Sequence, residues 1–261
     1  MKTLLISLLL LSLTNIAFAG NSVIINQVTT GNSNSITVDV DGNDNEINMS
    51  HGGGNNTINI TQEGKDGYVG YTSAWGSGAS WGGDLDGDSN SLLVKQLCNQ
   101  STCGGDRFEF HIQGDSNDVE FYQGYTVTAG GVASSDTVEH GGHSIILDIH
   151  GSSNTFLGSQ RSNNSGHEHS MVTYIYGDSN DIYMRQDSNV SKTMNLTVNN
   201  DTNNIDMVQT GNAAHSATVT VSGSYSTTLD LKQQGGTAQS YSLSQSCATV
   251  GGCSVSLTQG N

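Results

Sequence analysis

The chain has 261 residues, a formal net charge of −16, 33 glycines and no proline. A negative charge of this size repels phosphate groups, so we expect no nucleic-acid partner. Proline cannot donate to a strand ladder, and its absence favours a chain that is nearly all β-sheet.

The first segment, residues 1–19, has the pattern of a secretory signal peptide. Lys2 precedes an apolar run at 4–13, and Ala17-Phe18-Ala19 provides small residues for cleavage before Gly20. The run is about half as long as the roughly 20 residues of a transmembrane helix. We therefore expect a secreted, extracellular or cell-surface protein.

Residues 20–261 contain a repeat with a constant spacing. Aligned segments begin at Asn21, Asn45, Asn56, Asn90, Asn117, Asn154, Asn180, Asn203, Thr227 and Cys253. Six positions later, all segments but one carry glutamine: Gln27, Gln62, Gln96, Gln123, Gln160, Gln186, Gln209, Gln233 and Gln259. The exception is His51. Among the segment starts, Asn45, Asn90, Asn117, Asn154, Asn180 and Asn203 follow turn-forming residues and are predicted turn asparagines.

The glutamines share a strand face with apolar residues. The positions two and four residues after the segment start are apolar in nearly every segment, as in Ile182/Met184 and Leu229/Leu231. Because strand side chains alternate, the glutamine points inward with them. A buried unpaired amide costs roughly 1–3 kcal/mol. Stacked amides can bond to one another along the stack, so we predict a glutamine ladder that fixes strand register.

A second strand precedes most of these segments, for example from Ser144 or Ser170, and is joined to them by a short turn. One such unit cannot bury its inner face alone, whereas stacked units bury a continuous core. The repeat therefore predicts an all-β fold, a β-solenoid of stacked strand-turn-strand rungs over 20–261. Loop insertions are expected at about 63–88, 97–106 and 124–142.

The four cysteines form two pairs that are close in sequence. In an oxidising compartment we predict two local disulfides, Cys98–Cys103 and Cys247–Cys253. Cross-linking to other chains is the alternative.

The repeat resembles the curlin repeat of curli fibre subunits. The segments that carry the resemblance are NNIDMVQTGN at 203–212, LDLKQQGG at 229–236 and SVSLTQGN at 254–261. The resemblance covers nearly all of 20–261, and the Asn-to-Gln spacing is its most specific element. In the first strand of the unit, the family's inward glutamine position is occupied here by Asp41, His150, Tyr176 or Asn199.

The resemblance implies a self-assembling subunit of an extracellular amyloid fibre that supports biofilms and adhesion. It implies that the chain itself is the main partner, in a homopolymer. A related nucleator and an outer-membrane secretion pore of Gram-negative bacteria are further implied partners. No nucleophile–base arrangement has supporting context, so we expect no enzyme activity.

Acidic turns are candidate calcium ligands, although the spacing of the residues does not match an EF-hand. The candidate residues are Asp39, Asp41, Asp86, Asp88, Asp115 and Asp178. Solvated turn residues are the simpler interpretation, and no cofactor is otherwise expected. Two histidine pairs, His140/His143 and His167/His169, fall in variable connections and could bind zinc or copper, although such histidines are usually solvated.

An alternative function is that of a monomeric secreted binding module. The glycine-rich insertion contains Trp75, Trp81, Tyr68 and Tyr71, which could stack on carbohydrate. A flat solenoid face could also bind a surface or ice, which would need a regular outward row of threonines. The sequence offers such a row only in fragments.

Overall fold

The computed structural model describes residues 20–28, 33–70, 83–97, 105–128, 131–135, 142–162 and 167–260. Within these residues the regular structure is entirely β-strand, and two parallel sheets hold most of it. No helix in the described part of the chain has the length and apolar character of a membrane span.

The strands of the first sheet, called here the β1 sheet, alternate along the chain with the strands of the second sheet. Its strands are β1 (Ser22–Val28), β3 (Glu46–Gly52), β5 (Tyr68–Val69), β6 (Gly83–Asp86), β8 (Arg107–Gln113), β12 (Ser144–Ile149), β14 (Ser170–Val172), β16 (Thr193–Met194), β18 (Ser216–Gly223) and β20 (Ser240–Cys247).

The second sheet, the β2 sheet, has nine strands in chain order. They are β2 (Ser35–Val40), β4 (Thr57–Glu63), β7 (Ser91–Leu97), β9 (Asp118–Gln123), β13 (Thr155–Arg161), β15 (Asp181–Asp187), β17 (Asn204–Thr210), β19 (Thr227–Gln233) and β21 (Cys253–Gln259).

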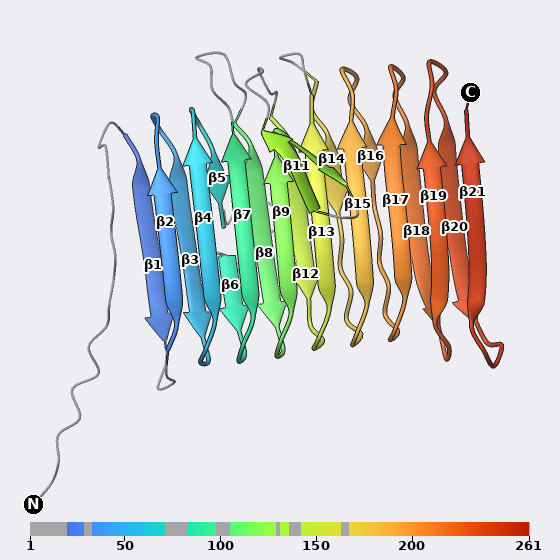
Figure 1. Cartoon of the computed structure of the whole chain (residues 1–261), viewed down its shortest axis with the longest axis horizontal. Helices are drawn as coiled ribbons and strands as arrows, with labels where there is room; N and C mark the ends of the chain where they lie inside the picture. The colour runs from blue at the N-terminus through green and yellow to red at the C-terminus, as the bar shows by residue number, and fades with distance from the viewer. Residues whose placement is uncertain are drawn as a thin grey trace, which may run out of the picture.

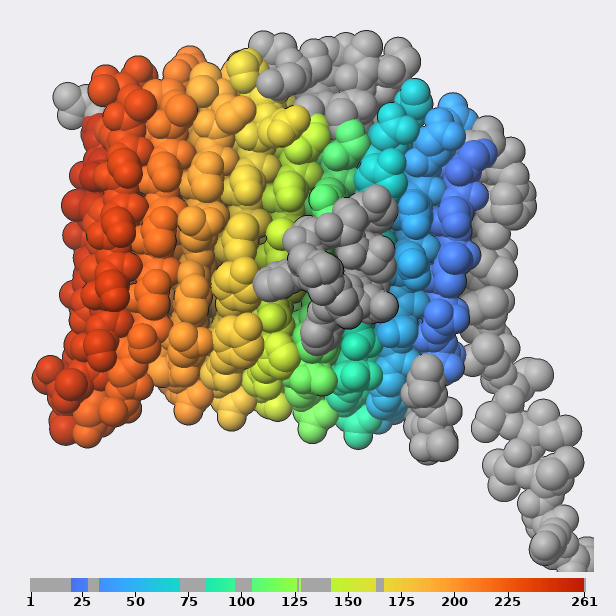
Figure 2. Space-filling model, turned by 180° about the vertical axis from the view of Figure 1, so that it is seen from behind, coloured from blue at the N-terminus to red at the C-terminus, as the bar shows by residue number. Residues whose placement is uncertain are grey.

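The chain passes from one sheet to the other and back, so each rung contributes to both sheets. Figure 1 shows the rungs side by side from β1 to β21, and Figure 2 shows them from behind as parallel bands of side chains. This arrangement confirms the predicted β-solenoid.

The core lies between the two sheets and follows the two-residue alternation of the strands. In β17, Ile205, Met207 and Gln209 are buried while the residues between them are partly exposed. Inward aliphatic and aromatic side chains form one continuous cluster from the first rungs to the last. Burying each such side chain contributes about 1.5–3 kcal/mol.

The region predicted as the insertion 63–88 includes part of the solenoid itself, so its predicted bounds are wrong. β5 and β6 both pair in parallel with β3 on one side and β8 on the other. The chain leaves this strand position at Gly70 and returns at Gly83, whose N–H donates to the Gly70 carbonyl over 2.9 Å. The two strand pieces have two and four residues, too short to show alternation in the sequence.

The predicted insertion at 124–142 contains an antiparallel hairpin of β10 (Tyr125–Thr128) and β11 (Gly131–Ser135). A second, small apolar cluster forms here from Tyr122, Val127 and Tyr183. The Tyr183 hydroxyl donates to the Val127 carbonyl over 2.9 Å. The hairpin is thereby fixed on the outer face of the β2 sheet. Of the predicted insertion at 97–106, residues 98–104 lie outside the described part of the chain.

Candidate functional sites

Eight of the nine predicted glutamines form one hydrogen-bonded column inside the β2 sheet. In each step the Nε2 of one glutamine donates to the Oε1 of the next, over 2.7 to 3.3 Å. The column runs through Gln62, Gln96, Gln123, Gln160, Gln186, Gln209, Gln233 and Gln259. All donors point toward the C-terminal end, so the column has a direction.

Gln27 does not belong to this column, contrary to the prediction. It lies in β1, in the opposite sheet, and is in register with His51 of β3. The position in register with Gln62 is held by Val40 of β2 instead. Accordingly, the buried Oε1 of Gln62 has no hydrogen-bond partner among the described residues. The first two aligned segments, which begin at Asn21 and Asn45, therefore belong to the other sheet.

A second amide column runs along the turns that precede the β2-sheet strands. Each Oδ1 accepts the backbone N–H of the next asparagine over 2.8 to 3.0 Å. The column contains Asn34, Asn56, Asn90, Asn117, Asn154, Asn180 and Asn203. Several Nδ2 groups also donate to a turn carbonyl of the following rung, as Asn117 does to Gly151 over 2.8 Å. These bonds fix the conformation of the turns. In several turns the residue directly before the asparagine is a serine in the left-handed region, such as Ser153 with φ of 59°.

Asn45, predicted with this group, lies at the opposite edge of the solenoid. Its Oδ1 accepts the Gly67 N–H over 2.8 Å, and its own N–H donates to Asn21 over 2.9 Å. The sequence could not separate the two edges, because the early rungs carry asparagine in both turns.

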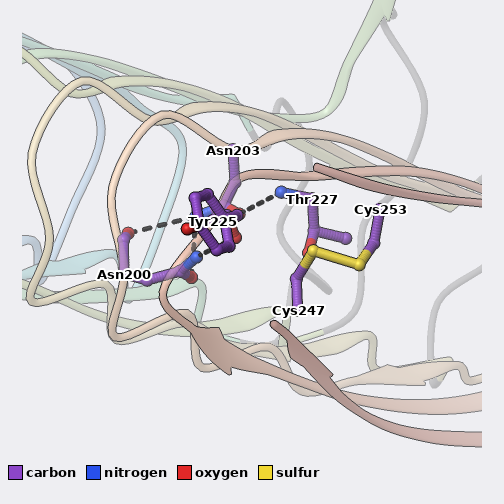
Figure 3. The surroundings of a disulfide bond; sticks show 6 residues. All are labelled: Asn200, Asn203, Tyr225, Thr227, Cys247 and Cys253. Carbon is purple, nitrogen blue, oxygen red and sulfur yellow. Dashed lines mark hydrogen bonds between the residues drawn. A yellow bond between two sulfur atoms is a disulfide. The ribbon is translucent and has the colours of Figure 1, made fainter. Parts of the chain in front are cut away.

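The asparagine column ends near a disulfide (Figure 3). The Thr227 N–H donates to Asn203 Oδ1 over 2.7 Å, and Cys253 occupies the next position in register after Thr227. Cys253 is joined to Cys247, which confirms this predicted pair. A covalent bond therefore closes the last turn, where the amide column is absent. Cys98 and Cys103 lie outside the described residues.

The two ends of the solenoid expose part of the core. Among the described residues, no strand pairs with the outer edges of the end strands β1, β2, β20 and β21. The partly buried apolar side chains that pack on the core all lie in these end strands: Val23, Ile25, Ile36, Val38, Tyr241, Leu243, Val255 and Leu257.

The aspartates predicted as calcium ligands have mainly turn roles in the structure. One carboxylate oxygen of Asp88, Asp115 and Asp178 accepts a backbone N–H from the neighbouring turn over 2.6 to 2.7 Å. Asp41 accepts the N–H of Gly42. Asp39 is exposed on β2, and Asp86 lies in β6. The structure does not bring these six residues together, and calcium binding stays a prediction.

Buried ionisable residues form a third column, of which the sequence had indicated only two members, His143 and His169. Asp106, His143, His169, Lys192 and His215 each precede a strand of the β1 sheet and lie in successive rungs. The stacked rings of His143 and His169 have centroids 4.8 Å apart. Both histidines are therefore part of the interior rather than of solvated connections. His140 lies outside the described residues, and His167 is half-buried.

Burial shifts the pKa values in this column toward the neutral forms. It raises the pKa of Asp106 to about 7, and the His143 N–H that donates to the carboxylate only partly offsets this. It lowers the pKa of His169 to about 4 and that of Lys192 to about 8. Burial lowers the pKa of His215 as well. Burial thus disfavours the charged forms of four residues of this column: Asp106, His169, Lys192 and His215.

His111, Asp148 and His150 form a cluster on the outer face of the β1 sheet. One ligand atom from each residue lies within 4.8 Å of the others, which makes this the group able to hold a metal ion in the described part of the chain. The resemblance to the curlin repeat aligned His150 with an inward glutamine of the family. The structure places the His150 side chain on the outer face of the β1 sheet instead. Cross-rung register brings the three together, so spacing along the sequence did not reveal them.

No family model, curated protein or solved structure matches this chain.

Proposed function

We propose that the protein is the subunit of an extracellular curli-like fibre that grows by end-to-end stacking of solenoids. The observation that carries the proposal is the pair of open ends. Each end presents two strand edges with which no described strand pairs, and four half-buried apolar side chains. Exposed strand edges of this kind are templates for another chain, and a second subunit satisfies both the backbone groups and the apolar face.

The inward apolar side chains of the two ends match in register. Continuing the parallel ladders of β20 and β21 by one step places Ser240 beside Ser22 and Ser254 beside Ser35 of the next copy. This register pairs the inward side chains Tyr241 with Val23, Leu243 with Ile25, Val255 with Ile36 and Leu257 with Val38. It also brings Gln245 beside Gln27, so a glutamine pair forms at the junction in the β1 sheet.

The charges disfavour a contact between two N-terminal ends, and a head-to-tail contact avoids their repulsion. Residues 233–261 contain no charged side chain, whereas Asp39, Asp41 and Asp44 lie in the first rung. Two N-terminal ends facing each other would bring like charges together, which is unfavourable. An uncharged C-terminal end avoids this repulsion and preserves the parallel strand direction.

The test is assembly of the purified protein after dilution out of denaturant. Thioflavin fluorescence, electron microscopy and fibre diffraction should show seeded fibres with a reflection near the 4.7–4.8 Å strand spacing. A folded, strand-rich monomer that persists at high concentration would overturn the proposal and favour a monomeric binding module. In that case carbohydrate and ice binding would be the next measurements.

A further inference from the structure

The cluster of His111, Asp148 and His150 is set by the parallel register of two neighbouring rungs. His111 of β8 and Asp148 of β12 are direct partners in the ladder. His150 follows Asp148 by two positions and therefore emerges on the same outer face. The His111 Nδ1 lies 3.5 Å from Asp148 Oδ1, and the His150 Nε2 lies 2.6 Å from the same oxygen. Both imidazoles thus converge on one carboxylate oxygen.

The outer nitrogens of both rings face oxygen atoms of neighbouring rungs. The His150 Nδ1 is 3.0 Å from Gln113 Oε1, and the His111 Nε2 is 3.8 Å from Asp84 Oδ2. The Ser50 hydroxyl donates to Asp84 over 2.8 Å and holds that carboxylate. An amide oxygen only accepts, so Nδ1 of His150 carries the proton and Nε2 is left to bind a cation. Metal-binding histidines have this arrangement, with the outer N–H donated to an oxygen.

The shared carboxylate oxygen, Asp148 Oδ1, lacks a hydrogen-bond donor among the described residues. It is buried and accepts no hydrogen bond from either of the nearby imidazoles. The other oxygen, Oδ2, accepts from the Tyr176 hydroxyl over 3.1 Å. With the His150 proton on Nδ1, Nε2 and Asp148 Oδ1 face each other 2.6 Å apart as two acceptors with no proton between them. A cation between Asp148 and the two rings would satisfy both acceptors.

We propose that His111, Asp148 and His150 form a binding site for a divalent transition-metal ion, with Zn²⁺ as the fitting ion. Zinc bonds to imidazole nitrogen and carboxylate oxygen are about 2.0–2.1 Å long, which sets tetrahedral ligand atoms about 3.3 Å apart. The separation of 3.5 Å between His111 and Asp148 already matches this spacing. The His150 ring needs to move outward by less than about 1 Å to admit the ion.

The surroundings complete the coordination and select the metal. A cavity of about 330 Å³ adjoins the cluster and leaves space for a water molecule as fourth ligand. Two imidazole ligands suit zinc or copper, whereas calcium takes oxygen ligands only. The Tyr176 ring stacks on His150 with centroids 4.9 Å apart and limits the movement of this ligand.

An ion at this position joins consecutive rungs. His111 comes from β8, Asp148 comes from β12, and His150 directly follows β12. The zinc-loaded protein is therefore expected to unfold at a higher temperature than the metal-free protein. This inference concerns the outer face of the solenoid and is independent of fibre growth at the ends.

The test is titration of the purified, tag-free protein with Zn²⁺ by calorimetry, followed by X-ray absorption at the zinc edge. We expect one ion per chain, bound by two imidazole nitrogens and oxygen. His150→Gln and Asp148→Asn should abolish binding, and Asp84→Asn should weaken it by about 10- to 100-fold through the orientation of His111. His167→Gln, which changes a histidine outside the cluster, is the matched control.

Circular dichroism of each variant checks that the solenoid is intact. The proposal is overturned if the wild-type protein binds no zinc. It is equally overturned if folded Asp148→Asn and His150→Gln variants bind zinc as tightly as the control. A parallel titration with Ca²⁺ should give no binding at this site, and tight calcium binding that Asp148→Asn abolishes would contradict the metal assignment.

Discussion

The Nε2 of Gln160 donates to the Oε1 of Gln186 over 2.9 Å, and both side chains are wholly buried between the two sheets. Gln186 in turn donates to Gln209 over 3.0 Å. A shift of one strand by one residue would move a glutamine to the outer face and leave its neighbours unpaired. The amide column therefore specifies register, while the aliphatic side chains around it supply most of the stabilisation.

Gln186→Leu tests the energetic role of the column. The substitution introduces an apolar side chain of similar size and leaves a donor of Gln160 and the acceptor of Gln209 without their partner. We expect the free energy of unfolding to fall by about 2–6 kcal/mol, since two buried groups lose their partner and each costs roughly 1–3 kcal/mol. Gln259→Leu, at the half-exposed end of the same column, should cost less than about 1 kcal/mol. Denaturant unfolding of the monomer measures both, and equal losses would contradict the account.

Asp106→Asn tests the buried acid of the ionisable column. Burial raises the pKa of Asp106 to about 7 from its ordinary value of 3.8. A raised carboxyl pKa gives a contribution to stability that is present below pH 3.8 and is lost as the pH rises to about 7. At about 1.4 kcal/mol per pKa unit, the loss is up to about 4 kcal/mol.

Asp106→Asn should therefore remove this loss and be more stable than the wild-type protein at pH 8. The measurement is the free energy of unfolding from pH 4 to pH 8. Asp44→Asn, at an exposed turn position, is the control and should follow the wild-type curve. A parallel pH curve for Asp106→Asn and the wild-type protein would count against a buried, protonated Asp106.

His169→Asn tests a pH dependence of stability with the opposite sign, from a buried base in the same column. Burial lowers the pKa of His169 to about 4 from 6.5. Its contribution to stability is present above pH 6.5 and is lost as the pH falls to about 4, by up to about 3 kcal/mol. Asparagine fits this column, because Asn21 and Asn45 occupy it in earlier rungs. The variant should lose less stability than the wild-type protein between pH 6.5 and pH 4, whereas His167→Asn should not change that slope.

Replacing Cys247 and Cys253 by serine tests the closure of the last turn. The two residues are six positions apart, and closing a loop of this length contributes about 2 kcal/mol. We expect faster hydrogen exchange of the amides in β20 and β21 in the double variant. The amides of β15, in the middle of the solenoid, should exchange unchanged. Unchanged protection of β21 would show that the rung is held without the disulfide.

The fold was predictable because its signals are local. Alternation such as that of Ile205, Met207 and Gln209, together with the constant distance from asparagine to glutamine, specifies strands, turns and an inward amide without long-range information. The paired residues Cys247 and Cys253 were predictable for the same reason, since they are close in sequence.

The remaining features depend on register between rungs. Gln27 and Asn45 were assigned to the wrong sheet because early rungs repeat the same pattern on both faces. The cluster of His111, Asp148 and His150 joins two rungs that are separated in the chain by β9, β10 and β11, so no fixed spacing along the sequence indicates it. The buried column carried one usable signal that was missed: Asp106, His143 and His169 each directly precede a strand of the β1 sheet.

The most direct test of the account is fibre growth of a variant that is altered only at the open C-terminal end. Leu257 points into the core of the last rung, and Thr258 beside it points outward. Seeded growth, measured by thioflavin fluorescence and electron microscopy, compares Leu257→Lys with Thr258→Lys. Both variants should give folded monomers, with elongation abolished in Leu257→Lys and retained in Thr258→Lys. Equal elongation of the two variants would contradict growth through stacked ends.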